Sequence, residues 1–272
     1  MLIIGLAALA FAGAARAEFD HTHAAWTAVL GKHVVLINDG TASQVRYAAM
    51  APDRLALKAY LASLSTVTET EFRNWDQPRQ MAFLINAYNA FTVEKILTRY
   101  PNLKSIRDFG NVIGDPWKDR FFKLFGRDAY LNQIEHEWLR KPGVYDEPRV
   151  HFALNCASIG CPLLRREAYV AEKLDAQLED QTRRFLSDRS RNRYNADKNT
   201  LEMSKIFLWY KIDWTSGYRG LGRAQAITTP EQFLARYAQL FTDDPAHQQR
   251  IAAGRAAITY LEYDWALNDV AP

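Results

Sequence analysis

The chain has 272 residues, of which 48% are hydrophobic, and a formal net charge of +3 at neutral pH. This length and apolar content suffice for a large buried core, so we expect one elaborate domain rather than two complete ones. The net charge is small and the basic residues are scattered among acidic ones, which gives no electrostatic reason to expect a nucleic-acid or lipid-surface binder.

The N-terminus has the pattern of a secretory signal peptide. Residues 1–17 form an apolar run that ends in Ala15-Arg16-Ala17, a small-x-small sequence that signal peptidase accepts before Glu18. The alternative is a membrane anchor, but an apolar stretch of about 15 residues is shorter than the roughly 20 needed to span a bilayer. We therefore expect cleavage, a periplasmic or secreted protein, a single domain over 18–272, and no integral membrane segment in it.

Apolar periodicity predicts two helices in the first third of the chain. After an N-terminal segment with a turn at 38–40, Pro52 and Asp53 open a helix with an apolar face at helical spacing, formed by Leu55, Leu57, Tyr60, Leu61 and Leu64. A longer helix follows from Asp76 to Arg99 and is stopped by Pro101.

The middle of the chain alternates loops with short elements. Residues 101–127 are expected to form a loop that enters a strand or hairpin. A helix of about three turns then follows Asp128, and on it the neighbouring Glu135 and His136 point about 100° apart. Residues 150–154 are too few to decide between a buried strand and the start of a helix.

The last third is predicted to be mostly helical. An amphipathic helix is expected over 167–188, a polar turn over 192–200, and further helices over 230–241 and 245–260. The aromatic segment Tyr263-Asp264-Trp265 then looks like a terminal clasp that packs on the core, with Asp264 paired to a buried donor.

The segment from His151 to Leu163 holds both cysteines, Cys156 and Cys161, together with a loop shaped by Gly160 and Pro162. Two readings stay open. The cysteines form a disulfide, which an oxidising compartment favours, or Cys156 is a reactive thiol. Redox exchange through the pair is a third possibility, although the spacing is not the C-x-x-C of thioredoxin-like sites.

A nucleophilic Cys156 needs a neighbour that lowers its thiol pKa from about 8.5. His136 and His151 are the candidate bases. The leading hypothesis takes His136, with Glu135 and Asn86 to orient it. Binding roles are assigned to Asn89, His151, Ser158 and Cys161. For His151 the alternative is a histidine satisfied by a buried hydrogen bond. Asn86 and Asn89 lie at i and i+3 in an apolar helix and must find partners, either in the backbone of the cysteine loop or in a polar pocket.

Metal and phosphate sites find little support in the sequence. The pair His21 and His23 has no third ligand within reach, and Glu135-His136-Glu137 lacks the second histidine of H-E-x-x-H. The glycines of 217–222 follow no strand and do not end in Lys-Ser/Thr, so they do not form a phosphate loop. No metal and no cofactor are expected.

Five ordered motifs resemble the domain of unknown function 547 family, and the resemblance covers about residues 20–268. It implies a mainly helical domain and assigns no reaction. The motifs are Ile85-Asn-Ala-Tyr-Asn-Ala90, Ile134-Glu-His136, His151-Phe-Ala-Leu-Asn-Cys156-Ala-Ser158 with Cys161-Pro162, Ser204-Lys-Ile-Phe-Leu-Trp-Tyr210 and Tyr263-Asp-Trp-Ala-Leu-Asn268.

We therefore expect an α+β, mainly helical single domain with a small strand element near the cysteine loop. This loop should lie in a cleft between the helix of Asn86 and Asn89 and the helix of Glu135 and His136. The leading functional hypothesis is a thiol-dependent hydrolase or acyl transferase acting on an amide or ester. The alternative is a non-enzymatic cell-envelope binding module with bridged cysteines, whose partner is a peptide, a glycan or an envelope protein.

Overall fold

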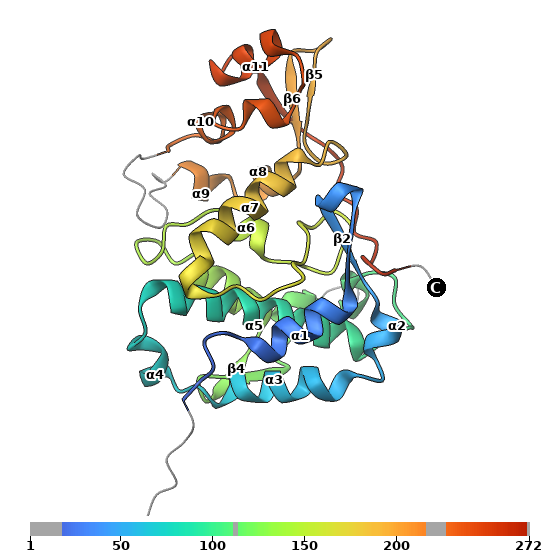
Figure 1. Cartoon of the computed structure of the whole chain (residues 1–272), viewed down its shortest axis with the longest axis vertical. Coiled ribbons are helices and arrows are strands. Elements are labelled where there is room, and N and C mark those ends of the chain that lie inside the picture. The colour runs from blue at the N-terminus through green and yellow to red at the C-terminus, as the bar shows by residue number, and fades with distance from the viewer. Residues whose placement is uncertain (1–17, 111–113, 216–226, 271–272) are drawn as a thin grey trace, which may run out of the picture.

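The structure is a computed structural model and describes residues 18–110, 114–215 and 227–270. The predicted signal peptide, 1–17, and the glycine-containing loop 217–222 lie outside the described residues. Within the described part the molecule is mainly helical, and its strands form three small sheets (Figure 1). The predicted α+β class is confirmed. None of the described helices is long and apolar enough to cross a bilayer.

The first third of the chain packs helices around α5 (Gln77–Leu97), which is buried at every position from Met81 to Val93. Asp76 caps this helix by accepting a hydrogen bond from the Arg79 N–H. The helix predicted from Asp76 to Arg99 ends at Leu97. The elements around it are α1 (Ala24–His33), the antiparallel hairpin β1 (Val34–Ile37) and β2 (Ala42–Val45), α2 (Tyr47–Met50), α3 (Arg54–Thr66) and α4 (Glu69–Arg73).

The predicted apolar face of α3 is right except at Leu55. Leu57, Tyr60, Leu61 and Leu64 are buried, but Leu55 is 81% exposed. Two residues along an α-helix correspond to a rotation of about 200°, so Leu55 and Leu57 point to opposite sides. Leu55 therefore faces solvent.

The middle of the chain contains the predicted hairpin and two short helices. The hairpin pairs β3 (Phe122–Leu124) with β4 (Arg127–Ala129). The predicted helix after Asp128 is the wider π-helix η4 (Gln133–Leu139). The open alternative at 150–154 is settled as a helix, α6 (Val150–Ala153). Two 3₁₀ turns, η2 (Ile106–Phe109) and η3 (Pro116–Lys118), lie before the hairpin.

Three predicted boundaries in the last third are wrong. The helix predicted over 230–241 ends at Ala235, and Ala238–Leu240 forms a separate 3₁₀ turn. The helix predicted over 167–188 begins at Leu174, after a 3₁₀ turn, because the side-chain amide of Asn86 pairs with both the N–H and the carbonyl of Tyr169 and holds that residue outside the helix. The helix predicted over 245–260 ends at Ala252, and Ala257–Tyr260 instead forms β7, which pairs in parallel with β6.

The remaining elements form the upper part of the molecule in Figure 1. They are η5 (Ala171–Lys173), α7 (Leu174–Ser187), β5 (Arg193–Asn195), β6 (Thr200–Met203), α8 (Ile206–Trp209), α9 (Lys211–Thr215), α10 (Pro230–Ala235), η6 (Ala238–Leu240) and α11 (Pro245–Ala252). The polar turn predicted over 192–200 is present only at 196–199, between β5 and β6, because β5 occupies 193–195.

The core consists of two hydrophobic clusters, and α6 contributes to both. Val150 and Ala153 belong to the cluster around α5, whereas Phe152 packs with Trp214 and Phe233 in the second cluster. The cysteine loop, 154–162, follows α6 directly. It is thus anchored at its start where the two clusters meet.

The C-terminal tail closes over the cysteine loop. The Ile159 N–H donates to the Ala266 carbonyl, and the Gly160 N–H donates to the Asp264 carbonyl, both at 2.8 Å. Ser158 and Leu267 form an isolated antiparallel β-bridge. The predicted clasp is therefore present. The predicted buried partner of Asp264 is wrong, because this carboxylate is exposed and accepts from the N–H of Ala266 in its own turn.

Candidate functional site

The two cysteines are joined in a disulfide between Cys156 and Cys161, with their Cα atoms 6.1 Å apart. Of the readings that the sequence left open, the structure shows the bridged pair. The bridge spans only five positions of the chain, so it shapes the loop itself.

Two asparagines hold the backbone of this loop. Asn89, on α5, donates to the Ala153 carbonyl at 2.9 Å and accepts from the Asn155 N–H at 2.8 Å. Asn155 in turn donates to the Pro162 carbonyl at 2.8 Å and accepts from the Ala157 N–H at 2.9 Å. Holding the cysteine loop is the structural role expected for Asn89. The amide of Asn86 instead fixes Tyr169, as described above, rather than orienting a histidine.

Three hydrogen-bonding groups surround the sulfur atoms. The Cys156 N–H donates to Cys161 Sγ at 2.8 Å, and the Tyr263 hydroxyl lies 3.2 Å from Cys161 Sγ and 3.3 Å from Cys156 Sγ. Ser158 Oγ lies 3.2 Å from Cys156 Sγ and 3.4 Å from Cys161 Sγ. Burial raises the pKa of Tyr263, so its hydroxyl stays protonated and is a donor at neutral pH.

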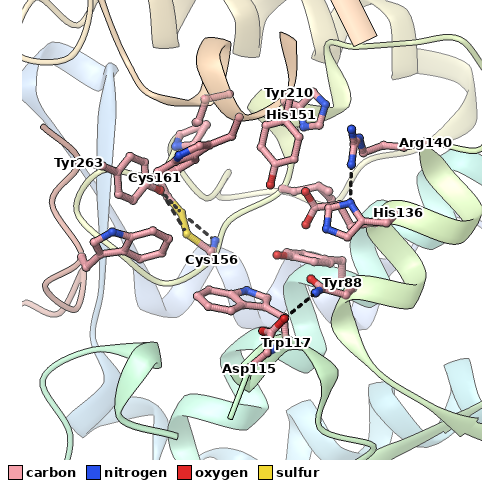
Figure 2. A pocket seen from close by; sticks show the side chains of 17 residues that line it. Tyr88, Asp115, Trp117, His136, Arg140, His151, Cys156, Cys161, Tyr210 and Tyr263 are labelled. Atoms are coloured by element: carbon pink, nitrogen blue, oxygen red, sulfur yellow. Dashed lines mark hydrogen bonds between the residues drawn. A yellow bond between two sulfur atoms is a disulfide. The ribbon is translucent and has the colours of Figure 1, made fainter. Parts of the chain in front are cut away.

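The disulfide borders a pocket of about 510 Å³ whose walls are largely aromatic (Figure 2). Trp209 stacks on Trp265 with 5.6 Å between ring centroids, and Tyr263 lies 4.6 Å from Trp265. The aromatic side chains that line the pocket are Tyr88, Trp117, Trp209, Tyr210, Tyr263 and Trp265. Such walls suit flat or apolar groups and cations.

A buried carboxylate, that of Glu135, forms part of the pocket lining. The hydroxyl groups of Tyr88 and Tyr210 hydrogen-bond to it. Burial and the charge of Glu135 both raise the pKa of Tyr88 and of Tyr210, which keeps these hydroxyls protonated as donors. Glu135 and His136, which are adjacent on the π-helix η4, both border the pocket.

Beside Glu135 lies a charged network centred on Asp213. Arg140 binds Asp213 through two hydrogen bonds of 2.6 and 3.0 Å, and His151 Nε2 lies 2.6 Å from the same carboxylate. Burial alone opposes ionisation, but the hydrogen bonds from His151 and Arg140 lower the pKa of Asp213 to about 2. Burial lowers the pKa of His151, so His151 is the neutral donor to an ionised Asp213.

His136 is attached to the same network. Arg140 Nη1 donates to His136 Nδ1, which leaves the proton of a neutral imidazole on Nε2. The His151 ring stacks on Tyr210 at 3.8 Å between centroids. The polar end of the pocket is therefore a continuous set of paired groups.

The structure brings together most of the residues singled out in the sequence. Five of them line the one pocket, namely Glu135, His136, His151, Cys156 and Cys161, and Ser158 contacts both sulfurs. Sequence reasoning missed Tyr88, Arg140 and Tyr210, which line the pocket, and Asp213, which binds Arg140 and His151. It identified Tyr263 only as part of a clasp. The signal for Tyr88 was its place between Asn86 and Asn89 on a helix already singled out.

Within the described ranges no group of three or more His, Cys, Asp or Glu side chains is placed to hold a metal ion. The polar groups that line the pocket are the disulfide, the tyrosine hydroxyls, the carboxylates of Glu135 and Asp115, the amide of Asn132, the guanidinium of Arg140 and the imidazoles of His136 and His151.

The model of a family described as "Protein of unknown function, DUF547" matches residues 72–186. The predicted resemblance to this family is confirmed over this segment, which contains the motifs at 85–90, 134–136 and 151–162. The two C-terminal motifs, at 204–210 and 263–268, lie beyond it. No curated protein and no solved structure matches the chain.

Proposed function

We propose that the DUF547 segment and the C-terminal part of the chain together form a binding site for a ligand with a cationic amine, such as a lysine side chain or the free N-terminus of a peptide. The observation that carries this proposal is Glu135, a buried carboxylate held by two tyrosine hydroxyls in the lining of an aromatic pocket.

The carboxylate of Glu135 can accept further hydrogen bonds. An ionised carboxylate has about four lone-pair directions, and Tyr88 and Tyr210 use one each. Arg140, a cation that borders the pocket, makes its bidentate ion pair with Asp213 instead. An ammonium group entering the pocket would supply the missing charge and hydrogen bonds.

The aromatic walls favour the same class of ligand. An ammonium group is attracted to the faces of tryptophan and tyrosine rings, and more strongly where water is excluded. Trp117, Trp209 and Trp265 offer such faces at the pocket, and the methylene groups next to an amine can pack on them.

A thiol-dependent hydrolase or acyl transferase is the second candidate, favoured by the fact that Cys156, Glu135 and His136 border one pocket. In this mechanism the Cys156 thiolate attacks an amide or ester carbonyl to give a thioacyl intermediate. A sulfur that is bonded to Cys161 is not a thiolate. The reaction therefore requires prior reduction, whereas ligand binding does not, and we rank binding first.

Export remains part of the proposal. The pattern of residues 1–17 supports a cleaved signal peptide, and a disulfide persists more readily in an oxidising compartment than in the cytosol. N-terminal sequencing of the protein recovered from its native host would give Glu18 as the first residue if cleavage occurs as proposed.

The binding proposal is tested with lysine-containing peptides and their acetylated counterparts, using isothermal titration calorimetry. We expect the free amine to bind at least about tenfold more tightly than the acetylated form, because acetylation removes the charge. Glu135→Gln, which keeps the shape and loses the charge, should remove this preference. The matched control is Glu137→Gln on the exposed side of η4, which should bind like the natural protein. Equal binding by Glu135→Gln and the natural protein would refute the proposal.

A further inference from the structure

We infer that the Cys156–Cys161 disulfide is a thiol–disulfide exchange centre, in which a thiolate from a small thiol or a cysteine-containing peptide attacks Cys156 Sγ and Cys161 leaves. This inference does not rest on the amine-binding proposal. It rests on the position of the bridge and on the different surroundings of its two sulfurs.

The first argument is access. Both cysteines line the pocket, but Cys156 is partly exposed, whereas Cys161 is only 4% exposed. Exchange requires a thiolate to reach a sulfur atom, so access decides which sulfur is attacked. Figure 2 shows the sulfur–sulfur bond at the side of the pocket, next to Tyr263. An incoming thiolate therefore meets Cys156 first.

The second argument is the stabilisation of the leaving group. A disulfide sulfur leaves faster when its thiol has a lower pKa, and hydrogen bonds to a thiolate lower that pKa. Cys161 Sγ accepts from the Cys156 N–H at 2.8 Å, and the hydroxyls of Tyr263 and Ser158 lie 3.2 and 3.4 Å away. The backbone N–H is a donor that serves Cys161 and not Cys156. These three groups are positioned to donate hydrogen bonds to the thiolate that forms on Cys161.

The third argument is that the loop is held in place from both ends. Asn89 and Asn155 fix its backbone, as described above, and Arg191 donates to the Cys161 carbonyl. The ring of Tyr263 is held against Gly160, where an added Cβ would lie only 2.9 Å from two ring carbons. The donors around Cys161 can therefore stay in position when the sulfur–sulfur bond breaks.

The reaction balances in two steps. In the first, a thiolate RS⁻ forms a bond to Cys156 Sγ, the bond to Cys161 breaks, and Cys161 takes the electron pair as a thiolate. In the second, another RS⁻ attacks the R sulfur of this mixed disulfide, and Cys156 leaves as a thiolate. Two thiolates are thereby oxidised to RSSR, and the disulfide of the protein is reduced. The two protein thiolates take up two protons from the solvent and become a dithiol. The reverse sequence oxidises the protein.

The test uses the folded, oxidised full-length protein and reduced glutathione as the probe. The reaction is quenched with N-ethylmaleimide, which blocks the freed thiol and prevents re-closure, and the modified cysteines are located by peptide mass mapping. We expect glutathione on Cys156 and maleimide on Cys161. Glutathione on Cys161, or reduction no faster than global unfolding measured in the same buffer, would overturn the inference.

The stabilising groups are tested by Tyr263→Phe and Ser158→Ala. Each removes one hydroxyl group near Cys161, and we expect the reduction rate to fall about fivefold for each. The thiol pKa of Cys161, measured by its ultraviolet absorbance in a Cys156→Ser background, should rise in both variants. Tyr145→Phe is the matched control, because this buried hydroxyl bonds Gln80 outside the pocket lining and should change neither quantity.

Unchanged rates in both variants would contradict the assigned role of the hydroxyls. The two tests have separate readouts. The proposed function is measured as peptide binding by the oxidised protein, whereas the exchange is measured by which cysteine carries glutathione and by the effect of Tyr263→Phe and Ser158→Ala, so either can fail without the other.

Discussion

At the scale of single residues, Asp213 binds two residues of the pocket lining, Arg140 and His151. It accepts from both Arg140 and His151, which come from elements more than 60 positions earlier in the chain. The sequence drew attention to His151 because histidine is a rare residue beside a cysteine motif. It offered no comparable signal for Asp213, an aspartate in an aromatic stretch, since its importance comes only from the partners that folding supplies.

The low pKa of Asp213 predicts how the free energy of unfolding depends on pH. Its pKa is about 2 in the folded protein and close to its ordinary value of 3.8 in the unfolded chain, so its ionised form favours folding above pH 4. This contribution, about 2 kcal/mol, should be lost as the pH falls from about 4 to 2. In urea unfolding at a series of pH values, Asp213→Asn should lack this part of the acid destabilisation.

The control for this measurement is Asp197→Asn, an exposed residue in the turn between β5 and β6. It should keep the pH profile of the natural protein. A profile for Asp213→Asn that runs parallel to the natural one between pH 4 and 2 would show that this carboxylate does not carry the effect.

At the scale of elements, the local patterns succeeded where neighbours in sequence decide the structure. The α5 helix was predicted close to its observed bounds because its apolar repeat lies within it and Pro101 follows its end. The start of α7 was missed because the cause, Asn86, lies 83 residues upstream of Tyr169. The parallel pairing of β7 with β6 was missed for the same reason, since its partner strand lies more than 50 residues away.

The contact between the C-terminal tail and the cysteine loop can be broken at Gly160. A Cβ there would lie 2.9 Å from the Tyr263 ring and 3.0 Å from the Asp264 carbonyl oxygen, so Gly160→Ala must displace the tail. We expect the free energy of unfolding to fall by about 1 to 3 kcal/mol. Chemical denaturation measures this loss, and proteolysis of the tail should become faster.

Gly31→Ala is the control, because an added Cβ in this helix meets its nearest neighbour, the Arg166 carbonyl oxygen, at an ordinary 3.8 Å. Alanine is also the better helix former, so Gly31→Ala should be neutral or slightly stabilising. Equal stability of the two variants would mean that the tail moves aside without cost.

At the scale of the whole molecule, the pocket lies where contributions from distant parts of the chain meet. The sequence identified the cysteines, Glu135 and His136 by residue type, and the structure places them at one pocket. It could not identify Tyr263 as a neighbour of Cys161, because 102 positions separate them and no periodic pattern connects them. The mainly helical class followed from periodicity and from the family resemblance, whereas the composition of the site depended on tertiary packing.

The disulfide should contribute little to global stability. It closes a loop of five positions, for which chain entropy gives about 2 kcal/mol, while the two hydrophobic clusters supply the core. We expect Cys156→Ala/Cys161→Ala and the reduced natural protein to stay folded and to lose about this amount in urea denaturation. Unfolding on reduction at 25 °C would instead show that the bridge is required for the fold.

The position of Tyr263 also has a consequence for biosynthesis. A ribosome makes both cysteines and all the residues of the family-matched segment long before it reaches Tyr263, Trp265 and Asn268. The nascent chain therefore carries its two thiols before the hydroxyl and aromatic groups of the tail arrive. Oxidation during synthesis would occur in a more open loop, and closure of the tail would then be the late event that gives the two sulfurs their final surroundings.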